Sequence, residues 1–122
     1  MNQVVTFLLT QNPDAAIKFY RDTLGLTYIH DDGFALVFDT KGIKLRISKV
    51  PKFTPAQHTV LGWETSDIHV ELAHLAKKGV TFERYPNMGQ DEQGICTFPG
   101  GSKVAWFKDP DGNVLSISQH PD

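Results

Sequence analysis

The first half of the chain alternates short apolar stretches with turn residues in a regular order. Residues 4–9 (VVTFLL) are apolar on both faces, which is typical of a strand covered on both sides. Asn12, Pro13 and Asp14 then form a helix start, and apolar side chains recur at helical spacing until Gly25. Turn residues separate the apolar runs that follow. These runs predict three strands, over residues 26–30, 34–38 and 43–48.

The second half repeats this order after a proline-containing linker over residues 50–55. Residues 59–65 are predicted to form a strand and Ser66-Asp67 a helix cap. Ile68, Leu72 and Leu75 form the buried stripe of a helix that ends at Gly79. Four strands are expected over residues 80–85, 95–98, 103–108 and 114–118, with a turn at Asp109–Gly112. The polar loop 86–94 is a candidate for a mobile lid.

The two halves therefore form an internal duplication of about 60 residues per repeat. At 122 residues the chain is expected to be a single domain, with module one at about 1–50 and module two at about 56–122. The predicted class is α+β, with two βαβββ modules that form a mixed sheet cupped around a cleft. The helices are expected on the outer face of this sheet.

Composition narrows the functional classes. The net charge of −2 gives no electrostatic reason to expect nucleic acid or an anionic membrane as a partner. The hydrophobic content of 40% is that of a globular protein without membrane spans. Cys96 is the only cysteine, so no internal disulfide is expected, and it is most simply a small buried residue. The N-terminus shows no secretion signal, which predicts a cytoplasmic location.

Two segments carry a resemblance to a known family. Residues 16–26 (AIKFYRDTLGL) resemble the first helix of the vicinal oxygen chelate superfamily, which includes glyoxalase I, extradiol dioxygenases and bleomycin resistance proteins. Residues 106–115 (WFKDPDGNVL) resemble the last hairpin of that family. The resemblance implies the glyoxalase/bleomycin resistance fold, usually within a homodimer.

The resemblance also implies where a divalent metal would be held. Enzymes of this superfamily use His, Gln or Glu side chains on four strands, and counting from the two motifs places these positions at Val5, Arg46, Val60 and Ser116. These four side chains do not form a ligand set for a divalent cation. We therefore expect no metal or other cofactor, and glyoxalase, epimerase and dioxygenase chemistry are not favoured.

Strand alternation suggests what lines the cleft in place of a metal. Val5, Phe7 and Leu9 share one face of their strand, and Val60, Gly62 and Glu64 share a face of another. Such a cleft is apolar and aromatic with a few polar groups, which suits a small organic molecule. The expected ligand-binding residues are Val5, Phe7, Arg46, Val60, Glu64, Trp106 and Ser116.

Several alternatives remain open at the level of sequence. Arg46 is either solvated on a half-buried strand or pairs with a ligand anion or with Glu64. Phe7 and Trp106 are either core residues or part of a ligand platform. A displaced metal site of His58, Glu64 and His120 would instead support a lyase or isomerase of the glyoxalase type. The leading hypothesis is a metal-free binding protein of the resistance or sequestration type. A ligand-less structural or partner-binding domain is the third hypothesis.

Overall fold

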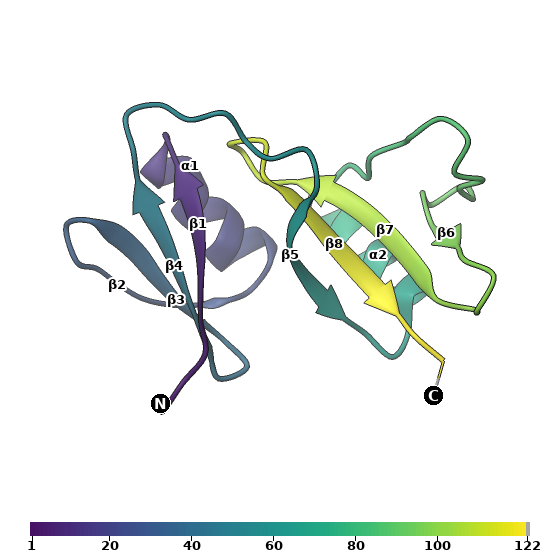
Figure 1. Cartoon of the computed structure of the whole chain (residues 1–122), viewed down its shortest axis with the longest axis horizontal. Helices are drawn as coiled ribbons and strands as arrows, with labels where there is room; N and C mark the ends of the chain where they lie inside the picture. The colour runs from purple at the N-terminus through teal and green to yellow at the C-terminus, as the bar shows by residue number, and fades with distance from the viewer. Residues whose placement is uncertain (122) are drawn as a thin grey trace. The chain divides into compact units, whose positions relative to one another are not determined.

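The computed structural model describes residues 1–121, and the chain divides into two compact units. The first unit comprises Met1–Pro55 and Asp109–Gly112, and the second comprises Ala56–Lys108 and the residues from Asn113 onward. Each unit contains a four-stranded mixed sheet with helix on one side (Figure 1). The predicted α+β class with two βαβββ modules is confirmed, and the strands are hydrogen-bonded in two separate sheets. Asp122, the predicted end of module two, lies outside the described residues.

The first sheet has the order β1-β4-β3-β2, and only its β1–β4 pair is parallel. Lys41 and Gly42 both have positive φ, the conformation of the two-residue turn that the sequence predicted there. Leu36, Phe38, Leu45 and Ile47 are fully buried. The strands are β1 (Val5–Thr10), β2 (Thr27–Asp31), β3 (Ala35–Thr40) and β4 (Ile43–Lys49).

The helical segment of the first unit changes type along its length. Asn12 caps α1 (Pro13–Ile17) by accepting a hydrogen bond from the Ala15 amide, as the predicted start requires. The helix continues as a π-helix, η1 (Lys18–Thr23), in which Leu24 N donates to Phe19 O five residues back. The sequence predicted one uninterrupted α-helix, because apolar spacing does not distinguish the two hydrogen-bonding patterns.

The second sheet has the order β5-β8-β7-β6, with β5 parallel to β8. Asp67 caps the helix by accepting from the Val70 amide, and the predicted stripe of Ile68, Leu72 and Leu75 is buried. Among residues 1–121, no helix is long and apolar enough to cross a membrane. The elements are β5 (Thr59–Glu64), α2 (Ile68–Lys77), β6 (Cys96–Thr97), β7 (Lys103–Lys108) and β8 (Val114–Gln119).

The predicted strand over residues 80–85 is wrong, and the one predicted over 95–98 is reduced to β6. Among residues 1–121, a single isolated bridge, between Phe82 and Phe107, joins the first segment to the sheet. The Gln90 side chain takes the place of a neighbouring strand, because it donates to Glu83 O and Gly94 O and accepts from Tyr85 N. The Gln90 side chain thus makes the hydrogen bonds to these backbone groups that a neighbouring strand would make in a sheet.

The polar loop proposed as a lid is held in place by many hydrogen bonds. Asp91 accepts from the amides of Gln93 and Ile95, and Arg84 donates to Glu92 O. His69 is exposed, and its Nδ1 lies 2.6 Å from the Gln93 side-chain oxygen. These contacts give the loop a defined conformation in this structure.

Candidate functional site

One face of β1 is apolar and open. Val5, Phe7 and Leu9 are 37%, 63% and 38% exposed, whereas Leu8 and Thr10, which alternate with them, are buried. Alternation therefore placed the three apolar side chains on a common face, as predicted. The expectation that β1 is covered on both sides is wrong, because only the face toward α1 and η1 is covered by this unit. We call Val5, Phe7 and Leu9 the open face of β1.

Arg46 lies beside this face, since β4 pairs with β1 and Arg46 is the register partner of Phe7. Its Nη2 donates to Asp32 Oδ2 at 2.6 Å, and 30% of its side chain is exposed. Within its own unit its carboxylate partner is Asp32, and the pairing with Glu64, a residue of the other unit, stays a prediction. The guanidinium is half-buried and its charge is already compensated.

The turn that holds Asp32 is strongly constrained. The amide of Phe34, the Arg46 guanidinium and the amide of Ala35 all donate to the Asp32 carboxylate, and together they hold its pKa well below its usual range. The Lys49 ammonium and the Gly33 amide likewise lower the pKa of Asp31. Sequence reasoning assigned this Asp-Asp-Gly segment only to a turn and missed its role as the partner of β4. The sequence did carry a signal for this pairing. Asp31 and Asp32 lie just before the predicted strand 34–38, and Arg46 and Lys49 lie near the end of the next predicted strand, so a hairpin of the two strands brings acids and bases together.

In the second unit, Gly62, Ser116 and Trp106 form a row across β5, β8 and β7, in which each residue is the register partner of the next. We call these three residues the Trp106 row. Tyr85 packs its ring edge-to-face against Trp106, with centroids 5.6 Å apart. Trp63 is the register partner of buried Ile117 and therefore lies on the opposite, helix-facing side. Tyr85 was missed as a site residue because it was assigned to a strand that does not form.

The remaining two predicted positions lie on β5. A register irregularity falls at Val60, between Thr59 and Leu61, so strand alternation does not fix which face its side chain occupies. Glu64 is opposite Ser118 and its side chain is 67% exposed. The predicted set is therefore divided between the units, with Val5, Phe7 and Arg46 in the first and the other four residues in the second.

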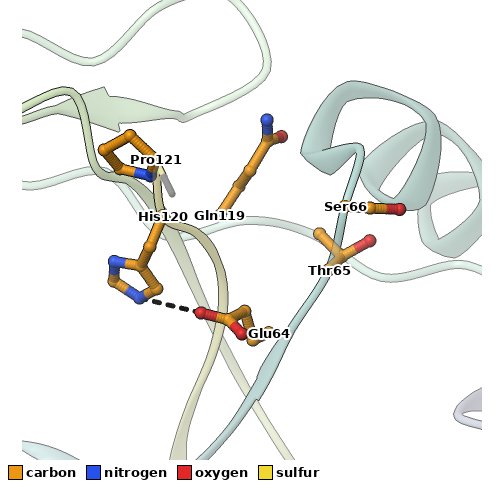
Figure 2. A pocket seen from close by; sticks show the side chains of 6 residues that line it. All are labelled: Glu64, Thr65, Ser66, Gln119, His120 and Pro121. Carbon is orange, nitrogen blue, oxygen red and sulfur yellow. Dashed lines mark ion pairs between the residues drawn. The ribbon is translucent and has the colours of Figure 1, made fainter.

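Glu64 and His120 meet at a polar depression of about 500 Å³ in the second unit (Figure 2). His120 Nε2 lies 3.9 Å from Glu64 Oε1 and 3.1 Å from Ser118 Oγ, while His120 Nδ1 lies 2.9 Å from Ser102 Oγ. The two hydroxyls thus orient the imidazole from both sides. The depression is lined by Glu64, Thr65, Ser66, Gln119, His120 and Pro121.

The displaced site predicted from His58, Glu64 and His120 is only partly assembled. Glu64 and His120 are neighbours, but His58 is exposed and does not join them in a group. Within residues 1–121, no three His, Cys, Asp or Glu side chains are gathered closely enough to hold a metal ion. Cys96 is buried, as predicted, and its thiol donates to Met88 O.

Comparisons with known proteins agree with this architecture. Residues 1–117 match the family model described as the Glyoxalase/Bleomycin resistance protein/Dioxygenase superfamily. A protein from Bacillus anthracis described as a glyoxalase family protein is 16% identical, with a TM-score of 0.76 over 99% of this chain and 96% of that one. A glyoxalase/bleomycin resistance protein/dioxygenase from Nocardioides is 17% identical, with a TM-score of 0.74 over 98% and 83% of the two chains.

A third solved structure, the lactoylglutathione lyase from Agrobacterium tumefaciens, is 20% identical, with a TM-score of 0.69 over 95% of this chain and 91% of that one. At these identities the three structures establish a common fold. No curated protein matches the sequence significantly.

Proposed function

Because the chain belongs to the glyoxalase/bleomycin resistance protein/dioxygenase superfamily, we propose that it binds a small organic molecule with a largely apolar body, without a metal ion. The open face of β1 is the observation that carries this proposal. Phe7 is 63% exposed at the centre of three apolar side chains, beside an arginine whose charge is already compensated. Apolar surface with a few polar groups is the usual lining of a small-molecule site.

The metal that the family resemblance implies does not fit this chain. Counted from the two sequence motifs, its ligand positions are occupied by Val5, Arg46, Val60 and Ser116. Valine has no donor atom, and a guanidinium carries a positive charge that repels a cation. A lone serine hydroxyl is too weak a ligand to hold the ion.

The groups available suit retention of a molecule better than its conversion. The open face of β1 offers apolar area, and the Trp106 row offers an aromatic ring and a hydroxyl. Such groups stabilise a complex by burial and single hydrogen bonds. The proposed activity is accordingly sequestration, as in resistance to a toxic compound. A homodimer and a cytoplasmic location stay predictions from the sequence.

The test is a titration of ¹⁵N-labelled protein with 1-naphthamide, followed by amide chemical shifts. We expect saturable shifts along β1 and β4, and an affinity loss of about fivefold or more in Phe7→Ser, because the lost aromatic contact contributes about 1 kcal/mol or more. Phe34→Ser is the matched control, since Phe34 is 81% exposed but lies outside the open face of β1. Equal losses in both variants, or shifts that spare β1, would overturn the proposal.

The second candidate is a metal-dependent lyase or isomerase with a displaced site. The Glu64–His120 pair at 3.9 Å favours it, because a carboxylate and an imidazole are both metal ligands. Thermal unfolding with added Ni²⁺, Zn²⁺ or Fe²⁺ distinguishes the candidates, since a ligand raises the melting temperature only if it binds the folded state. Our first candidate predicts no increase. An increase that His120→Asn abolishes would support the second.

A further inference from the structure

The Trp106 row contains an unusually close approach between two strands. A Cβ added to Gly62 would lie 2.3 Å from Ser116 Oγ, closer than any side chain tolerates. Gly62 does not have a positive φ, so what the glycine provides is room for the Ser116 hydroxyl, which would have to rotate away from a larger side chain. The absent side chain at position 62 leaves the Ser116 hydroxyl in the middle of this face of the sheet.

The Ser116 hydroxyl also differs from the neighbouring Ser118 hydroxyl in its hydrogen bonding. Ser118, two residues further along β8, is hydrogen-bonded to His120. Among residues 1–121, by contrast, the Ser116 side chain has no hydrogen-bond partner. Every buried side-chain oxygen and nitrogen in this part of the chain does have a partner, so the unpartnered Ser116 Oγ is accessible. An accessible hydroxyl next to an aromatic ring can donate a hydrogen bond to a bound molecule.

The neighbours of this hydroxyl indicate the class of that molecule. Trp106 is the direct cross-strand partner of Ser116, so both side chains stand on the same face, and Tyr85 extends the aromatic surface. Of the nearby charges, Lys108 and Glu83 pair with each other at 3.5 Å, and Glu64, on the same face of β5 as Gly62, lies 3.9 Å from His120. The aromatic surface therefore favours a flat ring system, and the compensated charges favour a neutral one.

We propose that Ser116 selects neutral, flat ring compounds that carry a carbonyl oxygen, such as aryl ketones, lactones and quinones. The ring would pack on Trp106 and Tyr85, and Ser116 Oγ would donate to the carbonyl oxygen. This inference rests on the proposed binding function and specifies its ligand chemistry at the second unit.

The experiment compares indan-1-one with indane, two bicyclic probes of the same frame that differ by the carbonyl group. The indole N–H signal of Trp106 is followed by NMR and is distinguished from that of Trp63 with Trp63→Phe. We expect indan-1-one to bind about 2- to 12-fold more tightly than indane, the range that one net hydrogen bond provides. Ser116→Ala should make the two affinities equal.

Two further variants make the test specific. Gly62→Ala keeps Ser116 but places a methyl carbon 2.3 Å from its hydroxyl, so the hydroxyl must rotate away and the preference should also be lost. Ser118→Ala is the matched control and should retain the preference, because that hydroxyl is bound to His120. A preference lost in Ser118→Ala and kept in Ser116→Ala would overturn the assignment.

The remaining outcomes separate this inference from the function on which it rests. If both probes shift Trp106 with equal affinity in the unmodified protein, binding stands and the role of Ser116 is wrong. If neither probe shifts Trp106, the inference fails as well, and the proposed function fails for the second unit. The titration of the open face of β1 with 1-naphthamide then decides whether the function survives in the first unit.

Discussion

Tyr20 and Asp109 are 89 positions apart in the sequence, yet the Tyr20 hydroxyl donates a 2.7 Å hydrogen bond to Asp109 Oδ2. Both residues are buried, with 0% and 5% exposure. Asp111 makes further hydrogen bonds between the same two segments, since its carboxylate accepts from the Thr10 hydroxyl and the Gln11 amide. The turn Asp109–Gly112 thus belongs to the first compact unit, although β7 and β8 on either side of it belong to the second. The first unit is complete only with this late segment of the chain.

Tyr20→Phe should therefore destabilise the protein by about 1.5–3 kcal/mol, because it removes a hydrogen bond to a charged group and leaves a buried carboxylate short of a donor. Urea unfolding at pH 7 measures the change. Tyr28→Phe is the matched control, since Tyr28 is only half-buried, and it should cost much less. Equal effects in the two variants would show that the Tyr20–Asp109 bond contributes little.

Because of the same hydrogen bond, we expect the stability of the folded protein to depend on pH in the alkaline range. Burial, followed by the Asp109 carboxylate, raises the pKa of Tyr20 well above its usual value. A raised pKa in the folded state contributes stability that is complete below the unfolded pKa of about 10 and declines above it. The stability difference between the unmodified protein and Tyr20→Phe should narrow above about pH 10. A difference that stays constant through that range would contradict the assignment.

The carboxylate of Asp32 predicts the opposite dependence, at acidic pH. The Phe34 amide lowers the pKa of Asp32 most, followed by Arg46 and the Ala35 amide. The ionised carboxylate therefore stabilises the folded state fully above the unfolded pKa of about 3.9, and this stabilisation is lost as the pH falls below it. Arg46→Met should raise this pKa only partway, because the two amides still donate. Carbon-detected NMR titration of the carboxyl groups measures it.

Lys49→Met provides the crossed control for this titration. Lys49 is the first cause of the lowered pKa of Asp31, so this variant should raise the pKa of Asp31 and leave Asp32 nearly unchanged. An Asp32 pKa that does not respond to Arg46→Met would mean that the two amides alone account for it.

The hydrogen bonds of the Gln90 side chain should stabilise the conformation of the polar loop 86–94. Its amide donates to Glu83 O at 2.9 Å and Gly94 O at 2.8 Å, and its oxygen accepts from Tyr85 N at 2.7 Å. Gln90→Ala should lower the free energy of unfolding by about 1–3 kcal/mol and accelerate amide hydrogen exchange within the loop. Gln93→Ala, which removes an exposed contact to His69, should do less. Unchanged exchange in Gln90→Ala would show that the loop is held elsewhere.

Local patterns predicted much of this architecture. The duplication, the Asn12 and Asp67 caps and the buried stripe of α2 depend on residues close together in sequence, and all three are present. Alternation with a period of two also placed Val5, Phe7 and Leu9 together on one face of their strand.

The features that the sequence did not predict depend on contacts between residues that are distant in the sequence. Residues 80–85 have the composition of a strand, but the Gln90 amide satisfies their backbone in place of a ladder. Arg46 could have met several acids, and its choice of Asp32 follows from the order of strands and the geometry of one turn. Glu64 ends β5 and His120 directly follows β8, its parallel neighbour, and sequence spacing alone does not reveal that these two ends meet.

The pairing of Arg46 with Asp32 sets the charge preference of the open face of β1. Because the guanidinium already binds a carboxylate at 2.6 Å, a second carboxylate gains only what a surface ion pair provides, about 0–1 kcal/mol. Arg46→Met should therefore weaken 1-naphthoate by at most about fivefold and leave 1-naphthamide unchanged. Methionine retains the apolar stem of the arginine, so the comparison isolates the charge.

Asp32→Asn supplies the converse measurement by calorimetric titration. Loss of the competing carboxylate leaves the Arg46 charge uncompensated, so the affinity for 1-naphthoate should rise while that for 1-naphthamide stays constant. Salt should reduce this gain, because the pair is 30% and 28% exposed and is screened by ions. A loss of tenfold or more for 1-naphthoate in Arg46→Met, with no gain in Asp32→Asn, would instead mean that Arg46 leaves Asp32 to bind the ligand anion directly.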